Sequence, residues 1–173
     1  MSGSETGLGI DAAEYGSALV QLFETWFYEP DVGINVNPLT DALRSCLTNV
    51  SAGCQFGGSC RDGFISIGPK GDVYPCGRFV GVKEFWLGNI HEENLQDILK
   101  SRRHIEMGER CKTIDDECRA CEIFDVCGSG CMYNAYIGNG SLSKKDPYCE
   151  SYRLLFERLT RAVNEELSEA ERS

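Results

Sequence analysis

Four cysteines lie within fourteen residues of this sequence, with the spacing C-x2-C-x5-C-x3-C. They are Cys118, Cys121, Cys127 and Cys131, and Gly128 and Gly130 lie between the last two. Thiolates packed this closely usually hold a soft metal ion or an iron–sulfur cluster. The alternatives are disulfides, or one structural zinc ion on these four sulfurs. The spacing of these four cysteines alone does not distinguish between a metal cluster, disulfides and a zinc site.

The composition excludes several classes of protein. The chain has 173 residues, of which 42% are hydrophobic and 25% charged, so we expect a globular protein with one modest core or two small units. Its net charge of −10 disfavours a phosphate-binding surface, and we expect no nucleic-acid partner. No apolar run approaches the roughly 20 residues of a membrane span, so we expect no membrane partner.

The redox compartment follows from the ten cysteines. The first residues have neither the basic nor the apolar region of a signal peptide. Cysteines without a secretory signal favour metal ligation over disulfides. We therefore expect a cytoplasmic protein with reduced thiols, and a disulfide-rich scaffold is a remote alternative.

Residues 1–50 have the pattern of an incomplete α/β unit. Asp11 and Glu14 resemble a capping box, and a helix with apolar residues at helical spacing is expected to end near Pro30. Val32–Val36 alternates like a short strand, and a second helix is expected after Pro38. One short strand cannot form a sheet alone. We therefore expect these residues to be the end of a larger α/β domain.

From residue 51 the sequence predicts a loop-rich unit. Residues 64–67 and 72–75 read as a hairpin around Gly68–Gly71, with Cys60 just before one strand and Cys76 just after the other. The hairpin would bring these two sulfurs together as ligands of one site. A helix is expected over 93–102, loops over 103–117 and 133–140, and a long amphipathic helix after Cys149.

The complete cysteine pattern resembles a known family. It reads Cys54-x5-Cys60-x10-Gly71-x4-Cys76, a gap, the four-cysteine loop, a second gap and Cys149. This resembles the SPASM domain, the C-terminal extension of radical S-adenosylmethionine enzymes that mature peptides and proteins. The signature of that domain is C-x(9–15)-G-x4-C, a gap, C-x2-C-x5-C-x3-C, a gap and C. The resemblance covers about residues 51–150.

The resemblance implies two interleaved four-iron, four-sulfur (4Fe-4S) clusters. The first auxiliary cluster would be held by Cys54, Cys60, Cys76 and Cys131. The second would be held by Cys118, Cys121, Cys127 and Cys149. Their expected work is electron transfer and positioning of a precursor peptide or protein substrate.

The expected fold class is α+β: a small loop-rich domain with a β-hairpin and flanking helices around the clusters, preceded by the last α/β elements of a truncated partial barrel. The expected domain boundaries place the barrel remnant at residues 1–50, the SPASM domain at 51–150 and a C-terminal helix at 151–173.

The C-x3-C-x2-C triplet that radical S-adenosylmethionine chemistry needs is missing, because Asn134 lies three residues beyond Cys131. The chain alone is therefore not expected to be catalytic, and S-adenosylmethionine would bind to a core domain in the same polypeptide or a separate one. Gly77 stands where anaerobic sulfatase maturases have an aspartate. This favours a maturase of ribosomally made peptides over a sulfatase maturase.

A different class of protein, a zinc-binding structural module that docks peptides without a redox role, is the second alternative. Two cysteines are left outside the pattern. Cys46 is expected in a helix core, and Cys111 is expected to be a free thiol.

Overall fold

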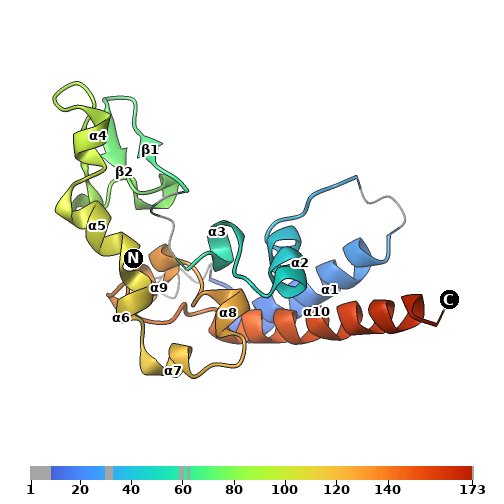
Figure 1. The fold of residues 1–173 in the computed structure, drawn as a ribbon. Helices are drawn as coiled ribbons and strands as arrows, with labels where there is room; N and C mark the ends of the chain where they lie inside the picture. Colours follow the sequence, from blue (N-terminus) through green and yellow to red (C-terminus); the bar gives the residue numbers. More distant parts are fainter. Residues whose placement is uncertain (1–8, 30–32, 59–60, 62, 173) are drawn as a thin grey trace.

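The fold is α+β, as expected: helices surround one small antiparallel sheet (Figure 1). The computed structural model describes residues 9–29, 33–58, 61 and 63–172. Helices α1, α2 and α10 form a helical layer, and residues 63–101, with the sheet, form a hairpin lobe at the other end of the molecule (Figure 1). The cysteine-rich turns lie between these two parts.

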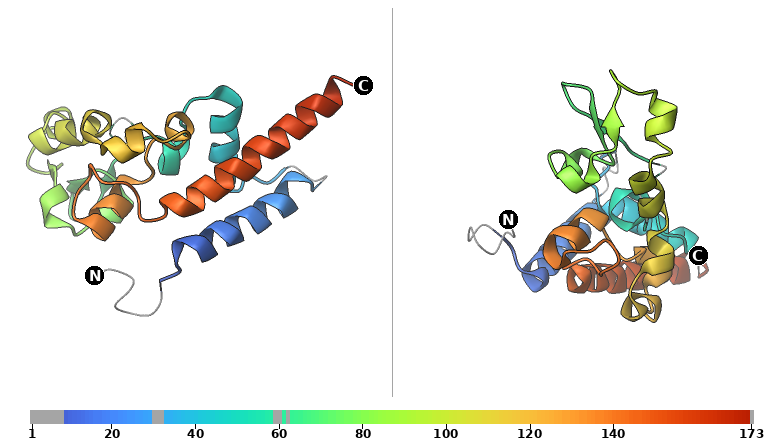
Figure 2. Two further views of the ribbon diagram at one scale, coloured as in Figure 1. Left: turned by 90° about the horizontal axis from the view of Figure 1, so that it is seen from below. Right: turned by 90° about the vertical axis from the view of Figure 1, so that its left-hand side faces the viewer.

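The helical layer is built on α1 (Ala12–Phe27) and α10 (Cys149–Ala170), which run side by side (Figure 2). The Glu14 N–H donates to the Asp11 carboxylate at 2.8 Å, so the expected N-cap is confirmed. The two helices approach closely at Gly16, where a Cβ would lie 2.8 Å from the Ser151 Cα. The core of this layer consists of Leu19, Phe23, Leu39, Ala42, Phe56, Cys127, Tyr152, Leu155, Phe156, Leu159 and Ala162.

The prediction of helix α2 (Leu39–Thr48) is confirmed. The prediction of a strand before it is wrong for the residues that the structure describes. Residues 30–32 lie outside the described residues, and 33–36 form no strand. Ile34 is 66% exposed, and its carbonyl accepts a bond from the Trp26 indole at 2.8 Å. The alternating pattern therefore belongs to a loop held by α1, because the described residues offer it no neighbouring strand.

The predicted hairpin is confirmed as β1 (Ser66–Ile67) and β2 (Asp72–Tyr74), with Ile67 opposite Val73. A third strand, β3 (Gly88–Asn89), pairs antiparallel with β2 and was not anticipated. The turn needs Gly71, whose φ is +84° and whose Cβ would lie 2.6 Å from the Asn89 amide oxygen. The glycine of the cysteine signature thus permits the close approach of β3.

Seven short helices connect these parts, and several of them replace expected loops. They are α3 (Gly53–Phe56), α4 (Leu95–Ile98), α5 (Arg102–Gly108), α6 (Arg110–Thr113), α7 (Asp116–Arg119), α8 (Phe124–Cys127) and α9 (Met132–Asn139). The loops expected over 103–117 and 133–140 are therefore wrong. The helix expected over 93–102 is divided into α4 and α5.

A second core explains these helices. Short 3-10 turns, η2 (Gly77–Phe79) and η3 (Lys83–Phe85), supply two phenylalanines that pack with Met107 of α5 and Met132 of α9. Helices of one or two turns are unstable alone and form here because these side chains are buried. Among the described residues, no helix combines the length and apolar character needed to cross a bilayer.

Candidate metal centre

The second cysteine set lines one cavity of about 370 Å³. Cys118 lies in α7, Cys121 in the following turn, Cys127 at the end of α8 and Cys149 at the start of α10. Lys145 and Arg153 also line the cavity. The structure thus gathers four thiols, from segments up to 31 residues apart, around a space large enough for a group bigger than a single water or ion.

Tight turns bring the first three of these cysteines together. The Cys121 N–H donates to the Cys118 carbonyl at 3.1 Å, and the Phe124 N–H donates to the Cys121 carbonyl at 3.0 Å. The Cys127 N–H then donates to the Ile123 carbonyl at 2.8 Å. A backbone that turns this often returns its side chains to the same side, which accounts for the C-x2-C-x5-C spacing.

Burial favours the protonated form of these thiols. Burial, and after it the neighbouring Cys149, raises the pKa of the Cys127 thiol to about 12. Burial also raises the pKa values of Cys118 and Cys149, and in both cases nearby Cys121 acts in the same direction. The sulfurs are therefore close enough for mutual repulsion as thiolates, which a positively charged metal group would relieve.

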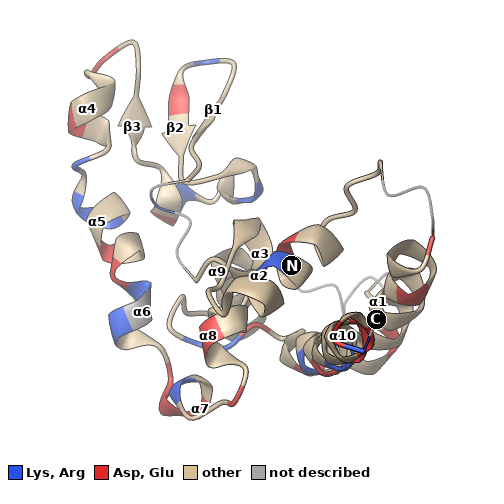
Figure 3. Ribbon diagram, turned by 45° about the vertical axis from the view of Figure 1, so that its right-hand side comes forward, with Lys and Arg blue, Asp and Glu red and all other residues tan. Residues whose placement is uncertain are grey.

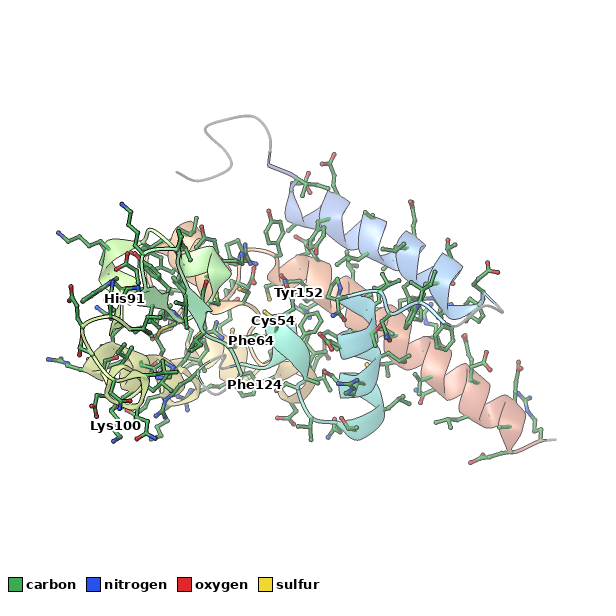
Figure 4. All side chains as sticks on the ribbon, turned by 90° about the horizontal axis from the view of Figure 1, so that it is seen from above. Cys54, Phe64, His91, Lys100, Phe124 and Tyr152 are labelled. Atoms are coloured by element: carbon green, nitrogen blue, oxygen red, sulfur yellow. The ribbon has the colours of Figure 1, made fainter. Side chains whose placement is uncertain are left out.

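The first cysteine set is less completely described. Cys54 lies in α3 and is exposed, Cys76 precedes η2 and is half-buried, and Cys131 precedes α9 and is buried. Cys60 lies outside the described residues, so its expected approach to Cys76 stays a prediction. Figure 4 places Cys54 at the junction between the helical layer and the hairpin lobe.

No three His, Cys, Asp or Glu side chains of the described residues lie close enough together to hold one metal ion. The four thiols of the second set nevertheless line one cavity. The first set is likewise not drawn together around one ion in the part of the chain that is described.

Asp146 connects the two sets and was missed in the sequence. Its side chain is 1% exposed and accepts bonds from the Cys131 N–H at 2.9 Å and the Asn134 amide at 2.8 Å. Its carbonyl accepts the Cys149 N–H at 3.0 Å. Burial raises the pKa of this carboxyl, and the hydrogen bonds oppose the rise. One residue thus fixes the backbone at a cysteine of each set, and an isolated aspartate in a polar loop gave no signal of this.

Arg78 occupies the other side of Cys131. Its guanidinium donates to the Cys131 sulfur at 3.3 Å and to the Asn134 amide oxygen at 2.6 Å, and it lies 4.5 Å from the centre of the Tyr133 ring. A cavity of about 190 Å³ opens beside it, lined by Ile10, Tyr15, Gln55, Arg78, Asn134, Tyr148 and Tyr152. The polar groups of this lining come from residues far apart in the chain and were not identified from the sequence.

Comparison with known proteins gives the family. Residues 54–122 match the SPASM family model, described as an iron–sulfur cluster-binding domain. The cysteine-type anaerobic sulfatase-maturating enzyme of Clostridium perfringens is 26% identical over 146 residues, which cover 83% of this chain and 39% of that enzyme. PqqA peptide cyclase of Xanthomonas axonopodis pv. citri is 26% identical over 87 residues, 50% of this chain and 23% of the cyclase.

A solved structure has a similar fold. The solved structure of native anSMEcpe with bound AdoMet and Kp18Cys peptide matches with a TM-score of 0.74 and 25% identity, over 91% of this chain and 45% of that chain. The chain thus spans less than half the length of these relatives. Residues 54–122 thus match the SPASM iron–sulfur cluster-binding domain, and the chain is similar to radical S-adenosylmethionine enzymes that modify peptides and proteins.

Proposed function

We propose that this chain holds two 4Fe-4S clusters that serve electron transfer and substrate positioning for a radical S-adenosylmethionine maturase. Residues 51–150 would form the cluster unit, with Cys54, Cys60, Cys76 and Cys131 on the first cluster and the four cysteines of the larger cavity on the second. The observation that carries the proposal is the gathering of Cys118, Cys121, Cys127 and Cys149 around one cavity.

The donor set fits a 4Fe-4S cluster. Such clusters are held by four cysteine thiolates, and a cluster is larger than one ion, so its ligands stand further apart. Four cysteine thiols line the cavity of about 370 Å³, which supports a group of this size and ligand type. The lining carries charges of both signs: Glu117, Glu122 and Asp146 are acidic, and Lys145 and Arg153 are basic.

When bound, the clusters supply one-electron redox centres whose potential depends on hydrogen bonds and exposure. The chain's own residues would keep the two centres close, because a turn closed by the Gly130 N–H on the Cys127 carbonyl at 3.1 Å separates their nearest ligands. Asp146 holds the backbone of Cys131 and Cys149 in fixed positions. The Arg78 guanidinium donates a hydrogen bond to the Cys131 sulfur.

The substrate would be a precursor peptide or protein, since the relatives include a peptide cyclase and a maturating enzyme solved with a peptide. The smaller cavity lies beside Cys131 and offers Gln55, Asn134 and Tyr148 as polar contacts for a peptide backbone. The radical core and its S-adenosylmethionine would lie in the same polypeptide or in a separate one. Residues 1–50 would be the last elements of its partial barrel, and 151–173 a C-terminal helix.

The assignment of ligands is tested by iron content in paired serine variants. Each single variant, Cys54→Ser or Cys127→Ser, should lose about half of the iron bound by the unchanged chain. The pair Cys54→Ser and Cys131→Ser should lose no more than half, because both residues serve the first cluster. The pair Cys54→Ser and Cys127→Ser should lose nearly all iron.

Cys46 provides the matched control. It is a half-buried cysteine of α2 whose sulfur lies 4.0 Å from the Thr160 hydroxyl, and Cys46→Ser should leave the iron content unchanged. The interleaved assignment is wrong if the pair Cys54→Ser and Cys131→Ser loses all iron while the pair Cys54→Ser and Cys127→Ser keeps half. Two zinc ions and no sulfide in the unchanged chain would replace the redox proposal by the structural module.

A further inference from the structure

We propose that Arg110 is a positioning residue for both clusters: its guanidinium fixes the loop that carries ligands of each, and its positive charge raises their reduction potentials. This inference rests on the proposed function. Arg110 begins α6 and is 1% exposed, although arginine is among the residue types least often buried. Figure 3 shows basic and acidic residues along α5 and α6, the helices that precede the cysteine turns.

Arg110 binds the backbone of three segments at once. Its Nε donates to the Leu142 carbonyl at 2.7 Å, and the two terminal nitrogens donate to five further backbone carbonyls. The further acceptors, at 3.0 to 3.4 Å, are the carbonyl oxygens of Gly58, Gly128, Ser129, Gly130 and Lys144. These segments follow Cys54, connect Cys127 to Cys131, and precede Cys149.

The connecting loop has a conformation that exposes its carbonyls to this arginine. Gly128, Ser129 and Gly130 have φ values of +56°, +66° and +73°, all in the left-handed region. For a residue with a Cβ this region costs about 1–2 kcal/mol, so Ser129 needs compensation. Three consecutive left-handed residues turn their carbonyl oxygens toward one point, and the Arg110 guanidinium occupies that point.

The charge of Arg110 reaches the second cysteine set. That set, Cys118, Cys121, Cys127 and Cys149, lines the cavity of about 370 Å³. Ser129, whose carbonyl accepts from Arg110 at 3.1 Å, lines the same cavity. Carbonyl oxygens solvate the guanidinium without carrying a formal charge. A buried cation at this position stabilises the more negative, reduced form of a cluster more than the oxidised form.

The test compares Arg110→Gln and Arg110→Lys with the unchanged chain, and Arg102→Gln is the control. Arg102 lies in neighbouring α5 with a side chain that is 93% exposed, so Arg102→Gln makes the same change of net charge in solvent. The readouts are iron per chain and the potential of each cluster in a titration followed by electron paramagnetic resonance. If the unchanged chain binds no iron, the proposed function fails and the inference about Arg110 falls with it.

With clusters present, Arg110→Gln should lower the reduced-to-oxidised ratio about tenfold at a fixed potential, a shift of about 59 mV for one electron. Arg110→Lys should stay closer to the unchanged chain because it keeps the charge, and Arg102→Gln should match the unchanged chain. Unchanged potentials in a fully loaded Arg110→Gln would overturn the inference.

If Arg110→Gln loses iron, two measurements identify the cause: the helical circular dichroism of the variant and the iron content of Arg110→Lys. If both variants keep the circular dichroism of the metal-free unchanged chain but bind less iron, Arg110 positions the ligands. Recovery of iron in Arg110→Lys alone assigns the effect to the charge, which also supports the inference. If both variants unfold relative to that metal-free chain, Arg110 is a general folding residue and the inference is overturned.

Discussion

Gly128→Ala should weaken the cysteine-rich junction severely. A Cβ at Gly128 would lie 2.4 Å from the Phe56 carbonyl oxygen and 2.7 Å from the Gly58 nitrogen. Both are backbone atoms, so no side chain can rotate away, and the segment after Cys54 must move by about 1 Å to reach ordinary contact. This movement would separate the first cysteine from the loop that carries Cys127 and Cys131.

The size of the effect has two sources. An alanine at the φ of +56° costs about 1–2 kcal/mol. Forcing an extra carbon into a packed contact costs about 1–3 kcal/mol. We therefore expect Gly128→Ala to lower the free energy of unfolding by about 2–5 kcal/mol, a large part of the 5–15 kcal/mol that stabilises a typical domain.

The assay is urea unfolding of the metal-free chain followed by circular dichroism, with iron content measured after anaerobic reconstitution. Gly140 gives the matched control, since its φ is +71° and a Cβ would meet no atom within 4 Å. Gly140→Ala should therefore cost only about 1–2 kcal/mol and leave the iron content unchanged. Equal destabilisation by the two substitutions would refute the close contact between the segment after Cys54 and the loop after Cys127.

Three further predictions concern the turn after Cys76, a buried histidine and the thiols. Gly77→Asp should change the unfolding free energy by no more than about 0.5 kcal/mol in urea, because a Cβ there meets no atom within 4 Å; a loss above about 1 kcal/mol would contradict this. His104→Leu should lower the free energy of unfolding in urea by about 2–5 kcal/mol, because the His104 ring nitrogens contact two backbone carbonyls at 2.8 and 3.1 Å. His91 is exposed, so His91→Leu should lower it by less than about 0.5 kcal/mol. Equal losses in the two variants would refute a stabilising role for the His104 contacts. The raised pKa of Cys127 means that its thiol holds a proton at neutral pH in the metal-free chain and must release it to bind iron. The iron retained against a chelator should therefore fall as the pH drops from about 8 to about 6. Iron retention that does not change with pH would contradict this proton release.

The sequence predicted the elements that have strong local signals. Helices α1, α2 and α10 carry apolar residues at helical spacing over ten residues or more, and the hairpin has its turn residues at Gly68–Gly71. The short helices α5 to α7 and α9 were expected to be loops, because one or two turns are too few to show a period. Strand β3 has two residues, Gly88 and Asn89, that both disfavour strands, and it exists only because β2 offers a partner.

The sequence predicted only those parts of the site that residue type and spacing reveal. The cysteine pattern identified the family, because few chemistries other than metal ligation keep eight thiols at fixed intervals. Asp146 and Arg110 were not found, since an isolated charged residue in a polar stretch has the same sequence signal whether it is solvated or buried. Their burial is decided by segments far along the chain, as the bonds from Arg110 to Gly58 and Leu142 show. Such partners follow from tertiary structure alone.

The central claim is that the chain holds two 4Fe-4S clusters, and the most direct measurement is iron, acid-labile sulfide and zinc per chain on protein purified without oxygen. The proposed function predicts about eight irons and eight sulfides, with visible absorption near about 400 nm. About two zinc ions with no sulfide would contradict it, because zinc has a filled d shell and no redox chemistry, and the cysteines would then serve structure alone.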